Sequence, residues 1–511
     1  MKKSIILASA VAAIYTQSVY AGTDTFFTPL THSIAVATPN HVNELHSPWQ
    51  APAGISQELL TSMAEIEADV DQSVVRAPGA SASASMWDMV AYDPTGKYIF
   101  IPHETPFGAG VSRYDIADDT NTILFSGDSS GIRGANDTWA NDYGAFDPAR
   151  FTPYGTVITA EEWSGEGRVI EILNPYAEPE DIQIVEKNSF ANVSHEGIMW
   201  SRKNKNVVYF VDEDRSGSIY KFIASDPTFD TGQTFVLAID AFDGDPAQNY
   251  NADVNINEVR TGSATWVPIT DEKGKALTEQ DPFENAATFR AGRIAADEVK
   301  ATPYGRPEDV EVSTLANGKE VLYFTATSEA SVYAVEMQSD TNAIVHLFVS
   351  EENTPKNVGF APTTGIINSP DNLAQDALGN IYIIEDAPNG SDVGGDIWFV
   401  RDTNNDGVAE SVDHFMSIQV AGAEATGMVF NPTKPTEFVV SVQHPTSTNL
   451  DAVNEGQGDA LWKFDLTDVV PPTCQKPKKG SKNPVRTCSH AYDFKFVKAL
   501  NRTAQKATKN K

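Results

Sequence analysis

MVAYDPTGKYIFIPHE, residues 89–104, is the stretch that decides the fold. It reads as a strand, a polar turn around Asp93-Pro94, a second strand at Tyr98–Pro102, and a polar tip at His103-Glu104. The alternation of apolar and polar residues, together with the β-branched and aromatic content, is typical of β-strands. We therefore predict a unit of two antiparallel strands that ends in polar side chains.

The same order recurs along the chain. Further copies begin at residues 144, 197, 310, 373 and 427, and several continue into a third strand, at 219–222, 332–335, 397–400 and 461–464. Where no large insert intervenes, the copies follow one another about every 55 residues, a spacing typical of propeller blades. We predict an all-β fold, a six-bladed β-propeller with an N-terminal extension and an insertion between the third and fourth blades.

The repeats suggest a division of the chain. Residues 57–72 read as an amphipathic helix, and residues 224–302, the largest insertion, as a cap over one face. The predicted segments are a signal peptide at 1–21, an extension and linker at 22–85, the propeller at 86–470 and a basic, flexible tail at 471–511.

The N-terminus has the pattern of a secretory signal peptide. Lys2 and Lys3 precede an apolar run, and a small-x-small pattern ends at Ala21. The apolar run is too short for a membrane span, and no later stretch is long and apolar enough. A twin-arginine pair is absent, so we expect export by the general secretory route, to the periplasm or the medium.

The net charge is −33, although the tail from Pro472 onward holds eleven Lys or Arg residues and one Asp. Such an acidic chain repels nucleic acid and anionic lipid and suits divalent cations, Ca²⁺ above all outside cells. Plain solubility is the alternative interpretation. The basic tail is either a contact for an anionic cell-surface polymer or a simple disordered terminus. We expect a monomer.

The two cysteines, Cys474 and Cys488, both lie in this tail. In an oxidising compartment we expect them to form one disulfide that closes a short loop. They are far in sequence from the acidic motifs, so neither is expected to bind a metal.

Equivalent strands of a propeller point the same way, so the residues that end them gather at one mouth. Clustered carboxylates raise one another's pKa unless a cation neutralises them, and hard oxygen ligands favour Ca²⁺. Solvated turn carboxylates are the alternative. The candidate ligands at these strand ends are Glu104, Glu161, Glu162, Asp212, Glu213, Glu385 and Asp386.

A second ring of acidic residues precedes the first strand of four units: Glu196, Glu308, Asp371 and Glu424. Arg306 is the one cation among these motifs. An arginine beside carboxylate-bound metal suits an anionic substrate such as a phosphate ester, whereas a structural ion pair is the alternative.

The ordered motifs resemble the PhoX-type alkaline phosphatase family. The resemblance runs from about residue 87 to 464, and the family's fold is a six-bladed propeller. It rests on TPYGT at 152–156 with Glu161-Glu162, His195-Glu196, RPE at 306–308, NSPDN at 368–372, and GAEATG at 422–427 through VQHP at 442–445.

The resemblance implies hydrolysis of phosphomonoesters at a mixed iron and calcium cluster. By position, Glu196 and Glu308 match cluster ligands and Arg306 matches a residue that holds the substrate phosphate. Asp371, Glu424 and either Asp212 or Glu213 fall in metal-ligand regions. We assign Arg306 and Glu308 as catalytic, and Arg306, His195 and Asn368 as substrate-binding.

One departure from the family concerns iron. The family has a cysteine iron ligand directly before the Glu-Glu pair, where this chain has Ala160. The family is also typically exported folded by the twin-arginine route, which this chain lacks. The two absences agree, and we expect the iron centre to be lost or altered and calcium to dominate.

A separate calcium motif spans DTNNDGVAESVD, residues 402–413. Its oxygen-bearing residues match the spacing of an EF-hand loop, except that Asp replaces the final Glu. The expected structural Ca²⁺ ligands are Asp402, Asn404, Asp406, Glu410 and Asp413, and a plain turn is the alternative.

Three functions follow from these observations. The first is a metal-dependent phosphatase, the second a calcium-dependent lactonase or other esterase, and the third a non-catalytic calcium-stabilised binding propeller. Arg306 favours the first over the second, because a lactone carries no net charge.

Overall fold

The structure is a computed structural model. The residues it describes are 25–37, 42–69, 86–135, 137–285, 289–387, 392–446 and 456–470, with the backbone of 473–475 and 487–489. The predicted signal peptide, the linker and most of the basic tail lie outside the described residues.

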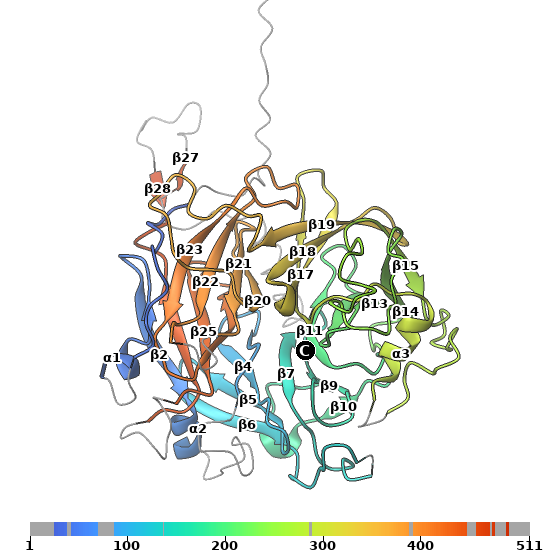
Figure 1. Ribbon diagram of the computed structural model, residues 1–511. Coiled ribbons are helices and arrows are strands. Elements are labelled where there is room, and N and C mark those ends of the chain that lie inside the picture. Colours follow the sequence, from blue (N-terminus) through green and yellow to red (C-terminus); the bar gives the residue numbers. More distant parts are fainter. Residues whose placement is uncertain are drawn as a thin grey trace, which may run out of the picture.

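Six strands form a closed ring at the centre of the molecule (Figure 1). Each contacts the next, and the last contacts the first. This arrangement confirms the predicted all-β propeller. The strands are β3 (Ala91–Tyr92), β7 (Phe146–Phe151), β11 (His195–Trp200), β16 (Pro307–Thr314), β20 (Pro370–Gln375) and β24 (Glu424–Phe430).

Antiparallel strands follow each inner strand outward, as the repeated unit predicts. In the first two sheets these are β4 (Tyr98–Pro102), β5 (Gly110–Asp115), β6 (Thr120–Ser126), β8 (Val157–Glu161), β9 (Val169–Ile172) and β10 (Ile184–Glu186). Next come β12 (Val207–Asp212), β13 (Ile219–Ala224), β14 (Gly232–Ile239), β17 (Glu320–Ala326), β18 (Ser331–Met337) and β19 (Asn342–Ser350). The last are β21 (Ile381–Glu385), β22 (Asp396–Arg401), β23 (Ser411–Ile418), β25 (Glu437–Gln443) and β26 (Ala460–Asp465).

The insertion is not a separate cap, in contrast to the prediction. Its strand β15 (Gly262–Pro268) pairs with β14 on one side and β19 on the other. Two four-strand meanders, β11–β14 and β16–β19, thereby merge into one sheet of nine strands. The insertion also carries helix α3 (Ala291–Glu298), whose Ala295 and Ala296 pack into the apolar cluster around Phe222.

The N-terminal extension completes two sheets. Strand β1 (Trp49–Gln50) pairs with β23, and β2 (Ser56–Ser62) pairs with the edge strand β26. The predicted helix at 57–72 is therefore wrong in its first half, and among the described residues of this range only those of α2 (Met63–Asp69) are helical. The backbone donors and acceptors along β26 favour an added strand, and this tertiary pairing outweighs the local helical pattern.

The remaining elements are short. They are α1 (Val42–His46), the 3₁₀ turns η1 (Pro179–Asp181) and η2 (Thr327–Glu329), and the hairpin of β27 (Thr473–Gln475) with β28 (Thr487–Ser489). The register of this hairpin places Cys474 opposite Cys488. The disulfide between them stays a prediction, and the backbone pairing is compatible with it.

Aromatic side chains fill the space between neighbouring sheets. Phe438 stacks on Phe464 with ring centroids 5.0 Å apart, and Tyr382 packs edge-on against Phe399 and Phe415. All five of these side chains are fully buried and belong to one apolar cluster. Such burial, at roughly 25 cal/mol per Å² of apolar surface, holds the sheets in fixed positions around the ring.

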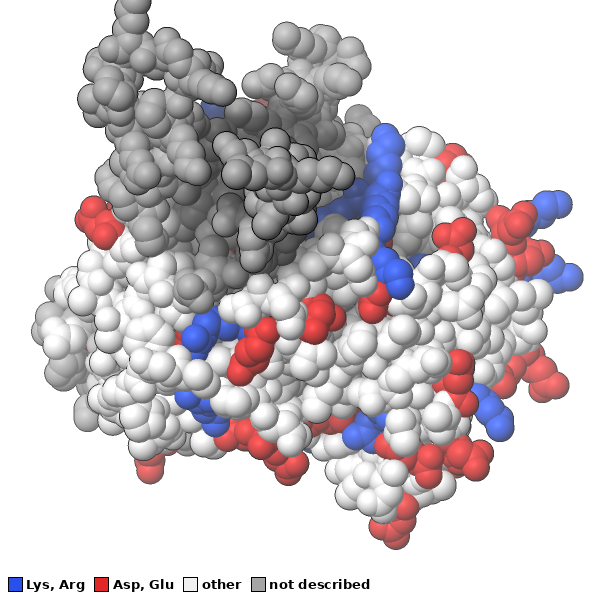
Figure 2. Space-filling view, turned by 90° about the horizontal axis from the view of Figure 1, so that it is seen from above, with Lys and Arg blue, Asp and Glu red and all other residues white. Residues whose placement is uncertain are grey.

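None of the helices in the described ranges has the length and apolar character needed to cross a bilayer. Figure 2 shows Asp and Glu side chains spread over the described part of the face seen from above, with Lys and Arg between them. The negative charge is therefore dispersed on this face rather than gathered in one patch.

Candidate metal centre

The inner strands share one irregularity at the end of the ring where they begin. In five of them the pairing with the next strand shifts register near the start, which is the signature of a β-bulge. A bulge bends a strand and re-aims its side chains, and bulges are common next to active sites. In β7, β11, β16 and β20 an acidic residue sits at the shift: Asp147, Glu196, Glu308 and Asp371.

The residue two positions before four of the buried acids has a left-handed backbone. Non-glycine residues seldom take positive φ values, and they cluster where a structure holds functional groups in place. The pairs are Met86 (φ 48°) before Asp88, Ala145 (51°) before Asp147, Arg306 (56°) before Glu308 and Ser369 (51°) before Asp371. Four of the repeat units thus share a left-handed backbone residue at the same position before the buried acid.

Two glycines let neighbouring inner strands approach one another here. A Cβ atom on Gly197 would lie 2.6 Å from the backbone nitrogen of Val310, and one on Gly427 would lie 2.4 Å from the carbonyl oxygen of Asp88. No side chain fits at either distance. The absence of a Cβ is therefore what allows acidic residues of adjacent strands to come together.

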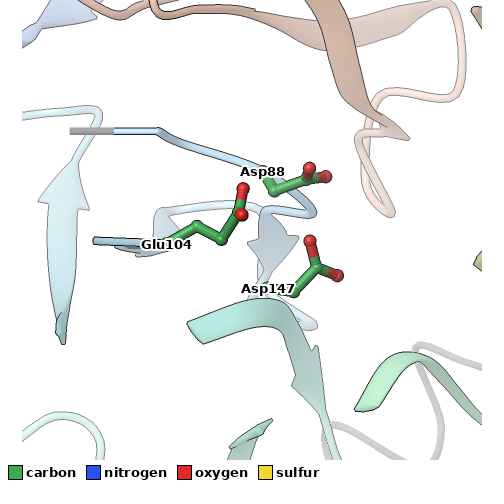
Figure 3. Close-up of side chains that lie close together, drawn as sticks. All are labelled: Asp88, Glu104 and Asp147. Carbon is green, nitrogen blue, oxygen red and sulfur yellow. The ribbon is translucent and has the colours of Figure 1, made fainter. Parts of the chain in front are cut away.

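Asp88, Glu104 and Asp147 form the first acidic cluster. One carboxylate oxygen from each lies within 4.8 Å of the others, and all three side chains are buried. Figure 3 shows them reaching into a common space from separate segments of the ribbon. Glu104 is fixed by hydrogen bonds from the Trp163 indole and from Gln443 (2.9 Å).

Glu196, Glu308 and Asp371 form the second acidic cluster, with the same spacing of their oxygens and the same burial. Asn372 donates a hydrogen bond of 3.0 Å to Asp371. The Nε atom of Arg306 lies 3.2 Å from Glu308 and also donates to Glu213. The second cluster thus has a cation at its edge.

Crowding of buried carboxylates changes their pKa values. Burial, reinforced by neighbouring carboxylates, raises the pKa of Asp88 to about 7 and that of Glu104 to about 8. The same causes raise the pKa of Asp147, Glu196 and Asp371 well above the ordinary values. Without a cation, the centre keeps protons that ordinary carboxyl groups lose below neutral pH.

The residues fit a bound cation. The Oδ2 atom of Asp147 and the Oε2 atom of Glu196 are buried and have no hydrogen-bond donor among the described residues. Buried polar atoms are normally satisfied, because an unpaired one costs roughly 1–3 kcal/mol. The donor set consists of carboxylate oxygens, which hard cations such as Ca²⁺ prefer.

Further acids surround the two clusters. The pKa of Glu162 is raised by burial and by Glu104, Glu213 and Glu308, in that order. Burial raises the pKa of Glu213 to about 7. Glu424 is the exception in this group. Its carboxylate lies 3.0 Å from His444, and burial raises its pKa, but the hydrogen bond and charge of His444, together with Asp386 and Arg306, outweigh burial and lower the pKa of Glu424.

Three predicted ligands have other partners. Glu161 accepts hydrogen bonds from the Arg168 guanidinium (2.6 and 3.0 Å) and from backbone amides. Asp212 is bound by Arg293 of α3, and Glu385 by the Trp398 indole and the Asp396 amide. The structure brings none of Glu161, Asp212 and Glu385 into the two clusters.

The three predicted substrate-binding residues differ in exposure and in partners. Arg306 is one-third exposed, as substrate contact requires. His195 is fully buried, its ring packs against Phe210, and burial lowers its pKa to about 3. Its position therefore suits packing rather than substrate contact. Asn368 is exposed, and its backbone amide donates to Glu385.

Sequence reasoning missed Asp88 and Asp147, which complete the first cluster. Both follow an aromatic residue at the start of a unit, as Trp87-Asp88 and Phe146-Asp147. His195-Glu196, Pro307-Glu308 and Pro370-Asp371 occupy the same place in their units. A ring side chain followed by an acid at the start of these units is the signal that indicates both residues.

Two arginines of the insertion were also missed. Arg290 donates to the backbone oxygen of Glu162 (2.9 Å), and Arg293 binds both Asp212 and Asp214. Neither residue belongs to a repeat unit, so periodicity gave no indication of them. They attach the insertion to the rim of the centre.

A polar cleft of about 420 Å³ adjoins the second cluster. Arg306 connects the cleft to the cluster, because it lines the cleft and lies beside Glu308. The cleft is lined by Glu213, Asp214, Arg215, Asn249 and Arg306.

The predicted calcium loop connects β22 to β23. Asp402 accepts hydrogen bonds from the amides of Asp406 and Gly407, and Glu410 accepts one from the amide of Thr403. Asp413 lies on β23, where it binds Arg401 (2.9 Å) and Thr25. These contacts are those of a turn closed by its own side chains, and Asn404 is exposed.

Ala160 lies on β8 among apolar side chains that include Ala191 and Val193, and it is fully buried. The position that carries a cysteine in the PhoX-type pattern is therefore part of the apolar packing between two sheets in this chain.

Comparison with known proteins agrees with this geometry. The family model described as alkaline phosphatase PhoX matches residues 128–446. Among solved structures, PhoX of Pseudomonas fluorescens in complex with vanadate, a transition state analogue, matches with a TM-score of 0.57 and 16% identity. The match covers 86% of this chain and 98% of that chain. At this identity, the structural likeness establishes the fold alone.

A gluconolactonase of Xanthomonas campestris is more distant, with a TM-score of 0.38 and 10% identity over 85% of this chain and 97% of that one. No curated protein matches the chain.

Proposed function

This chain belongs to the PhoX family of alkaline phosphatases, and we propose that it is an exported, metal-dependent phosphomonoesterase with Ca²⁺ as its main cation. The observation that carries the proposal is the position of Arg306, which touches the second acidic cluster and lines the adjacent cleft. A guanidinium is suited to bind phosphate oxygens because its donors match their geometry.

We read the nine-stranded sheet as two blades joined by β15, which gives six blades in all. The cations are assigned to the two clusters of Asp88, Glu104 and Asp147 and of Glu196, Glu308 and Asp371, with Glu162, Glu213 and Glu424 around them. Carboxylate donors and Ala160 at the family's cysteine position favour calcium over iron. When bound, the cations supply positive charge against the phosphoryl oxygens.

The chain's own residues orient the ester. Arg306 donates to the phosphoryl oxygens, while Glu213 and Glu308 both contact its Nε atom and hold the guanidinium in place. The left-handed backbone at Arg306 is fixed by its amide, which donates to the carbonyl of Asp214 (3.0 Å). Because the guanidinium is already held in place before the substrate binds, little free energy is spent on reorienting it during the reaction.

Hydrolysis of p-nitrophenyl phosphate by the mature protein tests the proposal, with Ca²⁺ added and with a chelator present. We expect calcium-dependent turnover that falls about a hundredfold in Arg306→Ala. The matched control is Arg202→Ala. Arg202 pairs with Glu311, outside the two clusters and the cleft. This control should keep wild-type activity.

No turnover under any metal condition would contradict the phosphatase proposal. The calcium-dependent lactonase or esterase and the non-catalytic binding propeller would then be the functions to test. Turnover that survives the chelator would contradict the metal dependence alone. Comparing iron with calcium after complete metal removal would test the expected preference.

A further inference from the structure

The cleft beside Arg306 is lined by a second arginine, Arg215, whose surroundings differ from those of Arg306. Glu213 is bound by Arg306, and Asp214 by Arg293 of α3 at 2.7 Å. Arg215 also lines the cleft, and its guanidinium forms no hydrogen bond or ion pair with any described residue. The two acids of the cleft thus already have arginine partners, and the guanidinium of Arg215 remains able to bind a ligand.

The wall that carries Arg215 is held firmly. The amide of Tyr250 donates to the carbonyl of Arg215 (2.7 Å), and the Tyr250 hydroxyl donates to the carbonyl of Ser328 (2.7 Å). Tyr250 therefore ties the loop that carries Arg215 to the turn η2, which follows β17 in the other half of the nine-stranded sheet.

The same tyrosine lies against the segment that carries Arg306. A Cβ atom on Gly305 would lie 2.8 Å from the Tyr250 ring, so only glycine permits this contact. Arg260 lies over the Tyr250 ring and forms an ion pair with Glu329 (2.7 Å), whose other oxygen accepts from the Gly305 amide. The insertion thus sets the position of Arg215 and Asn249 relative to Arg306.

We propose that Arg215, with Asn249, forms a subsite for the leaving group of the ester and selects phosphomonoesters whose alcohol carries a second anionic group. This inference rests on the proposed function, because it places the transferred phosphate at Arg306. A second anion further along the same cleft then meets the unpaired guanidinium of Arg215. A charge-assisted hydrogen bond of this kind favours the charged substrate by about tenfold.

Two matched esters test the subsite. Glycerol 2-phosphate and 2-phosphoglycerate differ at one position only. A hydroxymethyl group of glycerol 2-phosphate is replaced by a carboxylate in 2-phosphoglycerate. We expect the ratio of their kcat/KM values to favour 2-phosphoglycerate in the wild type and to fall about tenfold in Arg215→Ala. Arg215→Lys should keep part of the preference, and Arg202→Ala should keep all of it. Equal ratios in the wild type and in Arg215→Ala would overturn the proposal.

A binding measurement separates the subsite from catalysis. Calorimetry would compare ethylphosphonate with phosphonoacetate and with methylenediphosphonate. Phosphonoacetate and methylenediphosphonate each carry a second anionic group. We expect both to bind more tightly than ethylphosphonate, and only in proteins that retain Arg215. If only one of them shows the advantage, the subsite takes that anion, carboxylate or phosphate.

The two proposals fail in different ways. If the wild type hydrolyses both esters but the ratio of the kcat/KM values does not change in Arg215→Ala, the subsite proposal is wrong and the phosphatase proposal stands. If no ester is hydrolysed yet phosphonoacetate still depends on Arg215 for binding, the subsite stands and the phosphatase is wrong. Because Arg215 is exposed, its replacement should not prevent folding.

Discussion

Arg293 binds Asp212 through two parallel hydrogen bonds, Nε to Oδ2 at 2.6 Å and Nη2 to Oδ1 at 2.7 Å. Asp212 ends β12, a repeat strand, whereas Arg293 lies on α3, within the insertion. The carboxylate is fully buried and the guanidinium is partly exposed. A residue that the repeat places near the centre is thus neutralised by the part of the chain that departs from the repeat.

Removing this guanidinium leaves a buried carboxylate unpaired. We expect Arg293→Ala to lower the free energy of unfolding by about 2 kcal/mol, less than for a wholly buried pair because Arg293 is partly exposed. Urea denaturation measures the loss. The double variant with Asp212→Asn should recover part of it, and a double variant no better than Arg293→Ala would contradict the pairing.

Metal removal should destabilise the protein in a pH-dependent way. In the metal-free centre the pKa values of Asp88 and Glu104 are raised to about 7 and 8, so the folded state binds more protons than the unfolded state above about pH 4. The stability that these groups contribute is present below that pH and is lost as the pH rises through 7 and 8.

Thermal melting with Ca²⁺ and with a chelator, from pH 5 to 9, checks this. The gap between the two melting temperatures should widen with pH, because deprotonated carboxylates bind the cation and repel one another without it. Glu196→Gln should narrow the gap. A gap that is constant across this range would show that the clusters do not hold the cation.

Gly427 should tolerate no side chain. We expect Gly427→Ala to cost more than 2 kcal/mol of stability, because the residue has a φ of 62° and its Cβ would lie 2.4 Å from the carbonyl oxygen of Asp88. Gly318→Ala is the matched control, since Gly318 also has positive φ (81°) but open space around it. If urea denaturation gave equal losses for the two variants, the close approach of the strands would not matter.

Lys221 provides a pH test away from the centre. Burial lowers the pKa of Lys221 to about 7, and its ammonium lies 4.6 Å from the centroid of the Trp266 ring. Between about pH 7 and 10.5 the unfolded state binds more protons at this residue, so its cost to stability is full below pH 7 and fades as the pH rises.

Lys221→Met should therefore stabilise the protein at pH 6 relative to the wild type, and this advantage should shrink towards pH 10. Urea denaturation at several pH values measures the difference. Lys434→Met is the control, because Lys434 is mostly exposed. An advantage that did not change with pH would show that folding does not lower the pKa of Lys221.

The propeller was predictable because its signal is repeated. Each copy of the strand, turn and strand pattern lends weight to the others, so the ambiguity of any one short apolar run matters little. The same repetition predicted that Glu104, Glu196, Glu308 and Asp371 lie together, since the topology gathers equivalent positions at one end of the ring, and the structure places all four in the two acidic clusters.

The misses have physical causes of their own. Residues 57–62 pair with an edge strand some 400 positions away in the sequence, and a local pattern contains no information about that partner. Glu161 and Asp212 stand at the right positions in their units, but arginines bind them, and sequence spacing does not show which carboxylates receive a counter-ion from outside the repeat.

Strand β2 pairs with β26, so that Leu59 lies opposite Trp462. The segment synthesised early is thus the outermost member of a sheet whose other strands are synthesised last. A ribosome that has synthesised this sequence only as far as residue 400 holds a chain in which β2 has no partner strand. Closure of the ring is therefore a late event in folding. A truncation before residue 460 would remove β26 and leave β2 without the strand it pairs with.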